Sequence, residues 1–306
     1  MLFRSATGLH ALDPATGNQL WAAPGRMSAP PVLISGAVLT GGHDGRLRVR
    51  DPQTGMELWS FDTTAEFVAA GFTTAIMPLG ACESHGEHMP LGTDGLTSHA
   101  LAVQIAEHLE RTVVLPPNYL GMSHHYRHQP MALSLSADTQ TRVIGDILAS
   151  LHHWGIHRVL LLNAHDGNIP SIEIAARDAK IAHPEMSIAT IDWWVITNQR
   201  APEETFRVWM GWGHAGEAET SLGLALFPEL MQMEHARGQV PATDPYVKEI
   251  WLFEELTAYG ASGAPRHATV EKGEVIIRTV IDYMTPYMRR FEDHGLDFAP
   301  QDEPEP

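Results

Sequence analysis

The chain has 306 residues with 20 basic and 37 acidic side chains, a formal net charge of −17. This acidic balance argues against nucleic acid and anionic membrane as partners. No apolar run approaches the roughly 18 residues of a membrane span, and the N-terminus lacks a signal-peptide layout, so we expect a soluble, cytoplasmic protein. The single cysteine, Cys82, excludes an intrachain disulfide, and the 18 histidines prompt a search for metal sites.

The first 62 residues contain an internal repeat. The pattern Asp-Pro-x-Thr-Gly followed by Leu-Trp begins at Asp13 and again at Asp51, an offset of 51 − 13 = 38 residues. Each copy predicts a turn between strands, with glycine supplying the positive φ. The repeat resembles that of quinoprotein (PQQ-type) β-propellers, which need more than two blades to close. We therefore interpret residues 1–62 as a propeller-like fragment, and one hypothesis is that a chimeric assembly joined it to the rest.

From residue 63 onward, apolar strands alternate with helical segments. Strands are predicted over 74–80, 113–115, 158–163 and 188–193, and helices over 96–109, 139–154, 172–181, 217–226 and 273–291. Strands separated by helices indicate an α/β domain with a parallel sheet covered by helices. In such sheets, sites form at the carboxyl ends of the strands. We expect this domain to span residues 63–295 and the polar tail 296–306 to be disordered.

Three clusters of potential metal ligands occupy predicted strand ends and loops of this domain. The first runs from Glu83 to Asp94 after a buried strand, the second from Asn163 to Asn168 after another, and the third covers residues 214–221. Carboxylate oxygen and imidazole nitrogen together suit zinc, manganese or iron. Each cluster alone could be a polar surface loop, but three of them in one α/β domain favour a metal site.

These clusters resemble the three motifs of the creatininase family, over roughly residues 63–295. The first loop contains every fixed position of the pattern Glu-x-His-Gly-x-His-x-Pro-x-Gly-Thr-Asp. The second matches Asn-Gly-His-Gly-Gly-Asn, with Ala164 and Asp166 as departures, and the third matches His-Ala-Gly-x-x-Glu-Thr-Ser. The resemblance implies an α/β/α layered domain, preceded here by the short all-β fragment, and assembly into homohexamers.

The resemblance also implies two divalent ions per chain, of zinc, manganese or iron. Glu83, Asp94 and His165 would hold one ion. His85, Asp94 and one further carboxylate would hold the other, so that Asp94 bridges the two ions.

The sequence offers two candidates for the further carboxylate. Creatinine-cleaving members supply it two residues after the histidine of the second motif, where this chain has Gly167. We expect Glu217 to supply the carboxylate in place of the missing one, with Glu219 as the alternative ligand. If Glu217 is the ligand, Glu219 would support the ligands or carry charge at a helix N-terminus. Hydrogen-bonding support of the ligands is expected from His88 and Asn163.

By the same resemblance, a metal-bridged hydroxide attacks the carbonyl carbon of a small amide. His214 matches the place at which the family has a histidine acid, and we expect it to protonate the leaving group. Contacts to the substrate are expected from Tyr126, Arg127 and His128, and an aromatic lid from Trp209 and Trp212.

The substrate is not settled by the motifs. Residues 121–130 depart from the usual family pattern, with His125-Tyr126 where many members have Glu-His. Together with Gly167, this departure argues against creatinine itself. We rank hydrolysis of a C–N bond in a cyclic or other small amide first and C–C ring opening of an oxidised inositol second. The remaining alternatives are a peptidase or deformylase and, in another class, a non-catalytic binding scaffold.

Overall fold

The computed structural model describes residues 2–4, 8–12, 19–24, 32–34, 37–41, 46–51, 53–62, 68, 70–206, 213–244, 247 and 249–296. The chain divides into two compact units, Met1–Phe72 and Thr73–Pro306. The second unit contains all three ligand clusters. The domain limits at residues 62 and 295 stay predictions, and the tail beyond 296 lies outside the described residues.

The first unit consists of antiparallel strands in two sheets. One sheet contains β1 (Leu2–Arg4), β2 (Gly8–Leu12) and β3 (Gln19–Pro24), and the other contains β4 (Val32–Ile34), β5 (Ala37–Gly41), β6 (Arg46–Arg50) and β7 (Glu57–Asp62). The predicted turn between β6 and β7 is confirmed: the Asp51 carboxylate accepts the N–H of Thr54 at 2.7 Å, and Gly55 has φ 72°. The corresponding turn after Asp13 lies outside the described residues, and the propeller resemblance stays a prediction.

The second unit is built on a parallel sheet in the order β11-β10-β8-β9. Its strands are β8 (Thr74–Leu79), β9 (Thr112–Val114), β10 (Arg158–Asn163) and β11 (Ser187–Asp192). The two central strands, β8 and β10, are buried almost throughout, as their continuous apolar sequences predict for strands covered on both faces. The predicted α/β fold class is confirmed.

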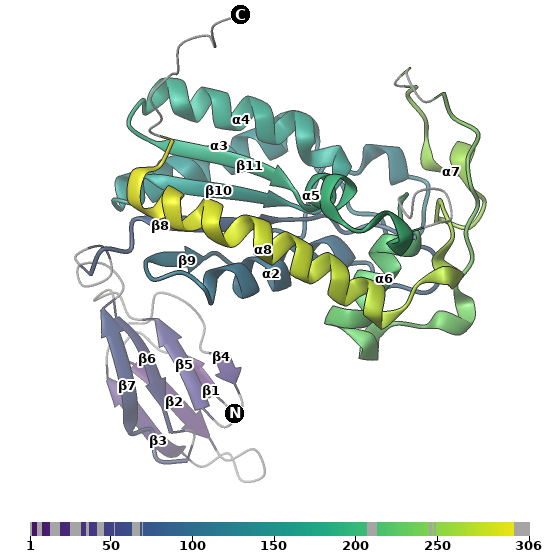
Figure 1. The fold of residues 1–306 in the computed structure, drawn as a ribbon. Coiled ribbons are helices and arrows are strands. Elements are labelled where there is room, and N and C mark those ends of the chain that lie inside the picture. Colours follow the sequence, from purple (N-terminus) through teal and green to yellow (C-terminus); the bar gives the residue numbers. More distant parts are fainter. Residues whose placement is uncertain are drawn as a thin grey trace, which may run out of the picture. The chain divides into compact units, whose positions relative to one another are not determined.

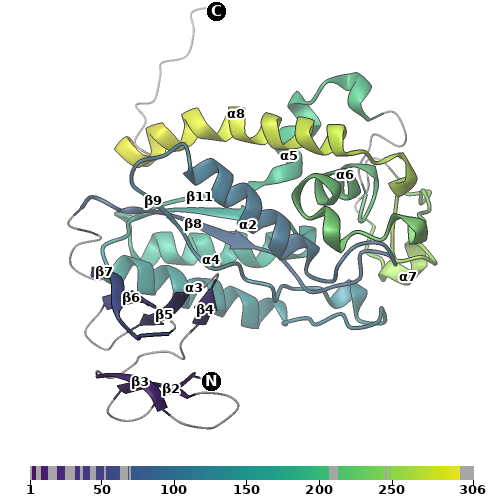
Figure 2. The same cartoon turned by 90° about the horizontal axis from the view of Figure 1, so that it is seen from below.

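Helices cover both faces of this sheet (Figures 1 and 2). The helices α3 (Ala137–His153) and α4 (Ile169–Ala182) lie on one face, and α2 (Thr93–Ala106) and α8 (Val270–His294) lie on the other. The short helices α5 (Trp193–Arg200), α6 (Glu217–Leu226) and α7 (Phe253–Leu256) lie beyond the carboxyl ends of the strands (Figure 1). Within the described part of the chain, no helix is both long and apolar enough to cross a bilayer.

The helix α3 begins two residues earlier than predicted. Its N-cap is Ser136, whose hydroxyl accepts the N–H of Thr139 at 3.2 Å, and Asp138 lies inside the first turn. Both residue types cap helices well, so sequence alone did not separate them. A carboxylate inside the first turn still interacts favourably with the helix dipole.

The strand order places two of the ligand clusters next to each other. After β8 the chain crosses to β9 on one side, and after β9 it crosses to β10 on the other side of β8. The loops that leave β8 and β10 therefore diverge, which opens a crevice at the carboxyl edge of the sheet. Leu79 and Asn163, the last residues of these strands, are register partners.

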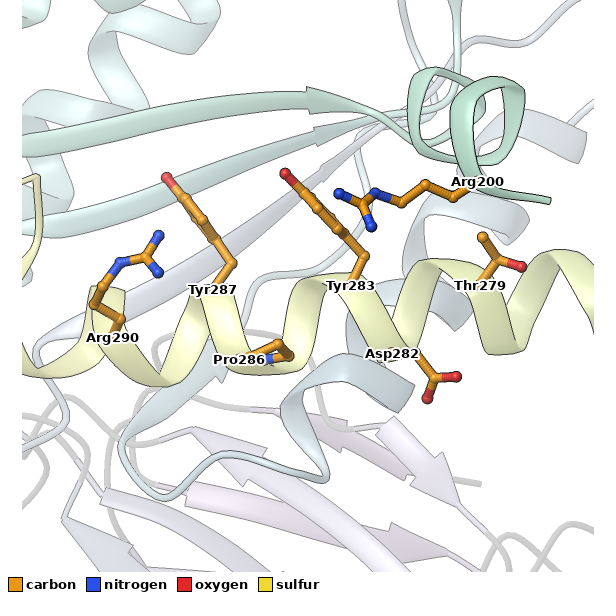
Figure 3. Close-up of a pocket in the computed structure, with 7 residues that line it drawn as sticks. All are labelled: Arg200, Thr279, Asp282, Tyr283, Pro286, Tyr287 and Arg290. Atoms are coloured by element: carbon orange, nitrogen blue, oxygen red, sulfur yellow. The ribbon is translucent and has the colours of Figure 1, made fainter. Parts of the chain in front are cut away.

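A cation–aromatic contact ties α5 to α8. The guanidinium carbon of Arg200, at the end of α5, lies 4.5 Å from the ring centre of Tyr283 on α8 (Figure 3). One turn further along α8, Arg290 lies over Tyr287 at 5.3 Å. These contacts line a surface pocket that shares no residue with the ligand clusters. The Arg200 contact anchors α5, whose first residue, Trp193, packs into the core between the sheet and α8.

The helices α6 and α8 pack so closely that Gly273 has no room for a side chain. A Cβ at this position would lie 2.1 Å from the carbonyl oxygen of Ser221. We expect Gly273→Ala to lower the free energy of unfolding by about 1–3 kcal/mol. At Gly145, inside α3, nothing lies within 4 Å of an added Cβ. Gly145→Ala should therefore raise the free energy of unfolding by about 0.4–1 kcal/mol. Urea unfolding measures both variants, and changes of the same sign would contradict this packing.

Candidate metal centre

The loop after β8 carries three charged side chains into the protein interior. Glu83, His85 and Asp94 are each at most 2% exposed. The loop folds back as predicted: the N–H of Glu83 donates to the carbonyl of Leu91 at 3.0 Å, and Gly86 has φ 66°. Asp94 lies in the first turn of α2, and its Oδ1 is 2.9 Å from Nε2 of His85.

The loop after β10 adds His165 to this cluster. Its Nδ1 lies 3.1 Å from Oε1 of Glu83 and 3.3 Å from Oδ2 of Asp94. Its backbone N–H donates to Oδ1 of Asn163 at 3.1 Å. Asp94 thus faces His85 with one carboxylate oxygen and His165 with the other, which is the arrangement of a bridging carboxylate.

The first turn of α6 separates the two glutamates considered as the further ligand. Oε1 of Glu219 lies 3.8 Å from Nε2 of His85, and its Oε2 accepts the N–H of Ala215 at 2.6 Å. Glu217 instead forms an ion pair with Lys272 in the first turn of α8. Residues two apart on a helix point about 200° away from each other, so one turn cannot aim both at the same ion. This placement favours Glu219 over Glu217, the reverse of our expectation from sequence.

His125 joins the cluster, although its sequence context did not indicate a role for it. Its ring stacks on that of His165 with centroids 5.6 Å apart, and its ligand atom lies within 4.8 Å of those of Glu83 and His165. Gly167 leaves the space for it, because a Cβ there would lie 2.8 Å from Cε1 of His125. The signal in the sequence was the departure from the family pattern at this position.

The donor set fits divalent metal ions. Both carboxylate oxygens of Glu83 and Oδ2 of Asp94 are buried without a hydrogen bond of good geometry, although His165 is near. Buried acceptors without donors are rare in native proteins, and metal ions would satisfy them. The structure also brings His214 within 4.8 Å of the ligand atoms of Glu83 and His85.

The carboxylates make this site favourable for cations. Burial opposes protonation of His85, but the charges of Asp94 and Glu219 raise the pKa of His85 well above its usual value. Burial likewise opposes protonation of His165, but the nearby carboxylates of Glu83 and Asp94 raise the pKa of His165 well above its usual value. Metal ligation needs both rings in the neutral form, so we expect metal binding to release protons to solvent.

His214 faces the cluster from the turn before α6. Its Nδ1 lies 3.6 Å from Oε1 of Glu83, and its Nε2 lies 2.6 Å from the carbonyl oxygen of Ser84. Because a carbonyl only accepts, we assign the proton to Nε2, which leaves the lone pair of Nδ1 directed at the cluster. Burial and the charge of His85 lower the pKa of His214 well below its usual value. A neutral His214 can accept a proton at Nδ1 and return it.

His88 and Asn163 hold the ligand-bearing loops. Nε2 of His88 bonds the hydroxyl of Thr220 at 3.0 Å, which connects the first loop to α6. The side-chain amide of Asn163 donates to Asp192 at 2.7 Å and to the His165 carbonyl at 2.8 Å. Burial and the charge of His85 lower the pKa of His88 to about 4, so this ring is neutral near pH 7. These placements suit the supporting role expected from sequence.

The cluster opens into a cavity of about 370 Å³, within the range of small-molecule sites. It is lined by Asp94, His125, Tyr126, Ala164, His165, Asp166, Trp193, Trp194, Asn198, Gly213, His214, Ala218, Glu219, Phe253 and Leu256. The apolar wall supplied by α7 has no signal in the sequence, because it comes from a four-residue helix remote from every motif.

The predicted substrate contacts divide into three groups. Tyr126 is buried, lines the cavity and packs against the rings of Phe253 and His214 at 4.3 and 4.6 Å. Arg127 and His128 lie at the surface, where His128 pairs with Glu254, and neither lines the cavity. The lid residues Trp209 and Trp212 lie outside the described residues.

The sequence matches the model of the creatininase family (creatinine amidohydrolase) over residues 61–287. It is 29% identical over 241 residues to a creatinine amidohydrolase of Pseudomonas putida, covering 72% of this chain and 91% of that protein. It is 28% identical over 237 residues to a 3-dehydro-scyllo-inosose hydrolase of Thermotoga maritima, covering 70% of this chain and 76% of that protein. Two creatininase structures, one with manganese and one a variant of zinc–zinc type, each superimpose with a TM-score of 0.63 at 29% identity, covering 74% of this chain and 93% of theirs.

Proposed function

Because this chain belongs to the creatininase family, whose members are metal-dependent hydrolases, we propose that it uses two divalent ions to hydrolyse a C–N bond in a small, preferably cyclic, amide. The observation that supports two ions most directly is the position of Asp94. One of its oxygens faces His85 and the other faces His165. Glu219 lies beyond His85 and Glu83 beyond His165, so each half of the cluster has its own carboxylate.

The two halves define two ligand sets. Glu83, Asp94 and His165 would hold one ion, with His125 within reach as an additional nitrogen ligand. His85, Asp94 and Glu219 would hold the other. Zinc, manganese and iron all accept this mixture of carboxylate and imidazole ligands. When bound, such a pair of ions lowers the pKa of a water molecule and polarises a carbonyl group.

The remaining chemistry belongs to the side chains of the cavity. His214 presents a free Nδ1 lone pair to the cluster and would move a proton from the attacking water to the leaving nitrogen. Tyr126 and Phe253 pack on the His214 ring and fix its orientation. Trp193 and Trp194 line the same cavity and leave a small apolar space suited to a compact ring.

A second candidate is ring opening of a polyhydroxylated ketone at a C–C bond. The cavity is not uniformly apolar, because Asp166, Asn198 and His125 add hydrogen-bonding groups to its lining. Such groups suit hydroxyls on a substrate, and a 28% identical relative is an inosose hydrolase. The same cluster and the same proton transfer by His214 would serve this reaction, with carbon as the leaving atom.

The test combines metal analysis with a substrate panel. Full-length protein loaded with manganese or zinc should hold about two ions per chain. The Asp94→Asn variant should lose these ions. The unchanged protein should hydrolyse a cyclic amide other than creatinine, and a chelator should abolish that activity. Activity that survives complete removal of metal would contradict the proposal. Turnover of inososes alone, among amides, formamides, short peptides and inososes, would favour the second candidate.

The predicted homohexamer and the cytoplasmic location stay predictions. Light scattering of the full-length protein tests the assembly, and a monomer at micromolar concentration would contradict it.

A further inference from the structure

A second group of metal-ligating side chains lies at the opposite edge of the sheet. His152 is in the last turn of α3, His183 directly follows α4, and Glu185 lies in the turn that leads to β11. Both helices run against the direction of the strands (Figure 1). Their C-terminal ends therefore meet at the amino edge of the sheet, whereas the metal centre lies at the carboxyl edge.

The three side chains already approach one another closely. One ligand atom from each of His152, His183 and Glu185 lies within 4.8 Å of the other two. His152 Nε2 contacts the Glu185 carboxylate, and the rings of His152 and His183 stack with centroids 4.0 Å apart. The ring of His157 lies 5.3 Å from that of His152, and its buried Nδ1 has no hydrogen-bond partner among the described residues.

The backbone around this group favours a cation and is held in place. Helix C-termini carry partial negative charge, and two of them, from α3 and α4, converge here. The turn after His183 is closed by the N–H of Met186, which donates to the His183 carbonyl at 3.0 Å. Lys180, the cation of this turn, donates to the carbonyls of Pro184 and Met186 at 2.5 and 2.7 Å.

We propose that His152, His183 and Glu185 form a separate site for a transition-metal ion of the zinc class, with His157 close enough to serve as a fourth ligand. Two imidazoles and a carboxylate are a donor set that zinc accepts. Tetrahedral bonds of about 2.0–2.2 Å place ligand atoms roughly 3.3–3.6 Å apart, a separation that rotation of these half-exposed side chains would give. A bound ion would link the ends of α3 and α4 to the beginnings of β10 and β11.

The test compares the full-length, untagged protein with variants at and beside this group. The hydrolytic centre is first loaded with manganese, and the protein is then dialysed against micromolar zinc. The total content of zinc plus manganese should be one ion per chain lower in His183→Ala than in the unchanged protein. Glu185→Gln, which preserves side-chain size, should weaken the same site by at least about tenfold. His153→Ala is the matched control, because it removes a neighbouring histidine of α3 that is not in the group. Hydrolytic activity should be unchanged in all three variants.

Thermal unfolding supplies a second measurement. Zinc should raise the midpoint of the manganese-loaded protein and of His153→Ala but not that of His183→Ala. The proposal is overturned if His183→Ala and Glu185→Gln bind as many ions as the control, or if zinc shifts all midpoints equally. Failure of the hydrolytic proposal would instead appear in Asp94→Asn, so the two outcomes are distinguishable.

Discussion

Replacing Glu219 with glutamine is expected to remove one ion from the metal centre and to lower turnover by more than about 100-fold, the upper range for loss of a residue that only supports a ligand. The reason is geometric. Oε2 of Glu219 is held by the Ala215 N–H, which leaves Oε1 directed at His85, 3.8 Å away. Glutamine keeps the size of the side chain but removes the charge that this half of the cluster needs. Elemental analysis after dialysis and steady-state kinetics measure the two effects.

Glu217→Gln is the matched control on the same helix turn. Glu217 pairs with Lys272, so its replacement should leave both ions in place. Glu217→Gln should lower the free energy of unfolding by about 1–3 kcal/mol, because it weakens a charge-assisted bond at a buried carboxylate. If Glu217→Gln lost an ion while Glu219→Gln kept both, the ligand assignment made from the structure would be wrong and the original expectation from sequence would stand.

His214→Gln should lower turnover by about 10²–10⁴-fold and leave the metal content unchanged. Glutamine places its amide N–H near the position of Nε2 and can still donate to the Ser84 carbonyl, so the contact that holds this turn is retained. It has no group that takes up and returns a proton near neutral pH, which is the role inferred for Nδ1. Metal content by elemental analysis and turnover on the same preparation are the measurements.

Two comparisons make the His214 result specific. His128→Asn changes a surface histidine paired with Glu254, outside the cavity lining, and should leave turnover within a few-fold of the unchanged protein. Loss of metal in His214→Gln would show that His214 is a ligand and not the proton carrier, because its ligand atom lies within 4.8 Å of those of Glu83 and His85. Full turnover with full metal content would exclude both roles.

The fold was largely predictable because its signals are local. The β10 strand covers 158–163 and α6 covers 217–226 in both the prediction and the structure, because β10 is a short apolar run between polar residues and α6 is followed closely by Pro228. The helix α8 extends from Val270 to His294, beyond the predicted 273–291, because Thr269 caps its N-terminus and Gly295, with φ 62°, follows its last residue. Capping depends on residues outside the periodic segment, which periodicity does not reveal.

The position of the ligand cluster was also predictable from the order of the motifs along the chain. Glu83, His85 and Asp94 follow one apolar strand and His165 follows another, and adjacent parallel strands end at the same edge of a sheet. Their convergence follows from chain order and strand direction, so the motif spacing was sufficient to predict it.

Which further groups face the metal centre depends on packing between segments far apart in the chain. On α6, Glu219 faces His85, whereas Glu217 points in another direction and pairs with Lys272. Lys272 belongs to α8 and lies 55 positions away in the chain. His125 reaches the cluster because Gly167 leaves space beside His165, and Phe253 reaches the cavity because α7 folds over it. Arg127 and His128, next to the buried Tyr126, turn to the surface because adjacent residues of a short helical turn point in different directions. These choices depend on helix phase and on packing between distant segments, and neither is encoded in the spacing of a motif.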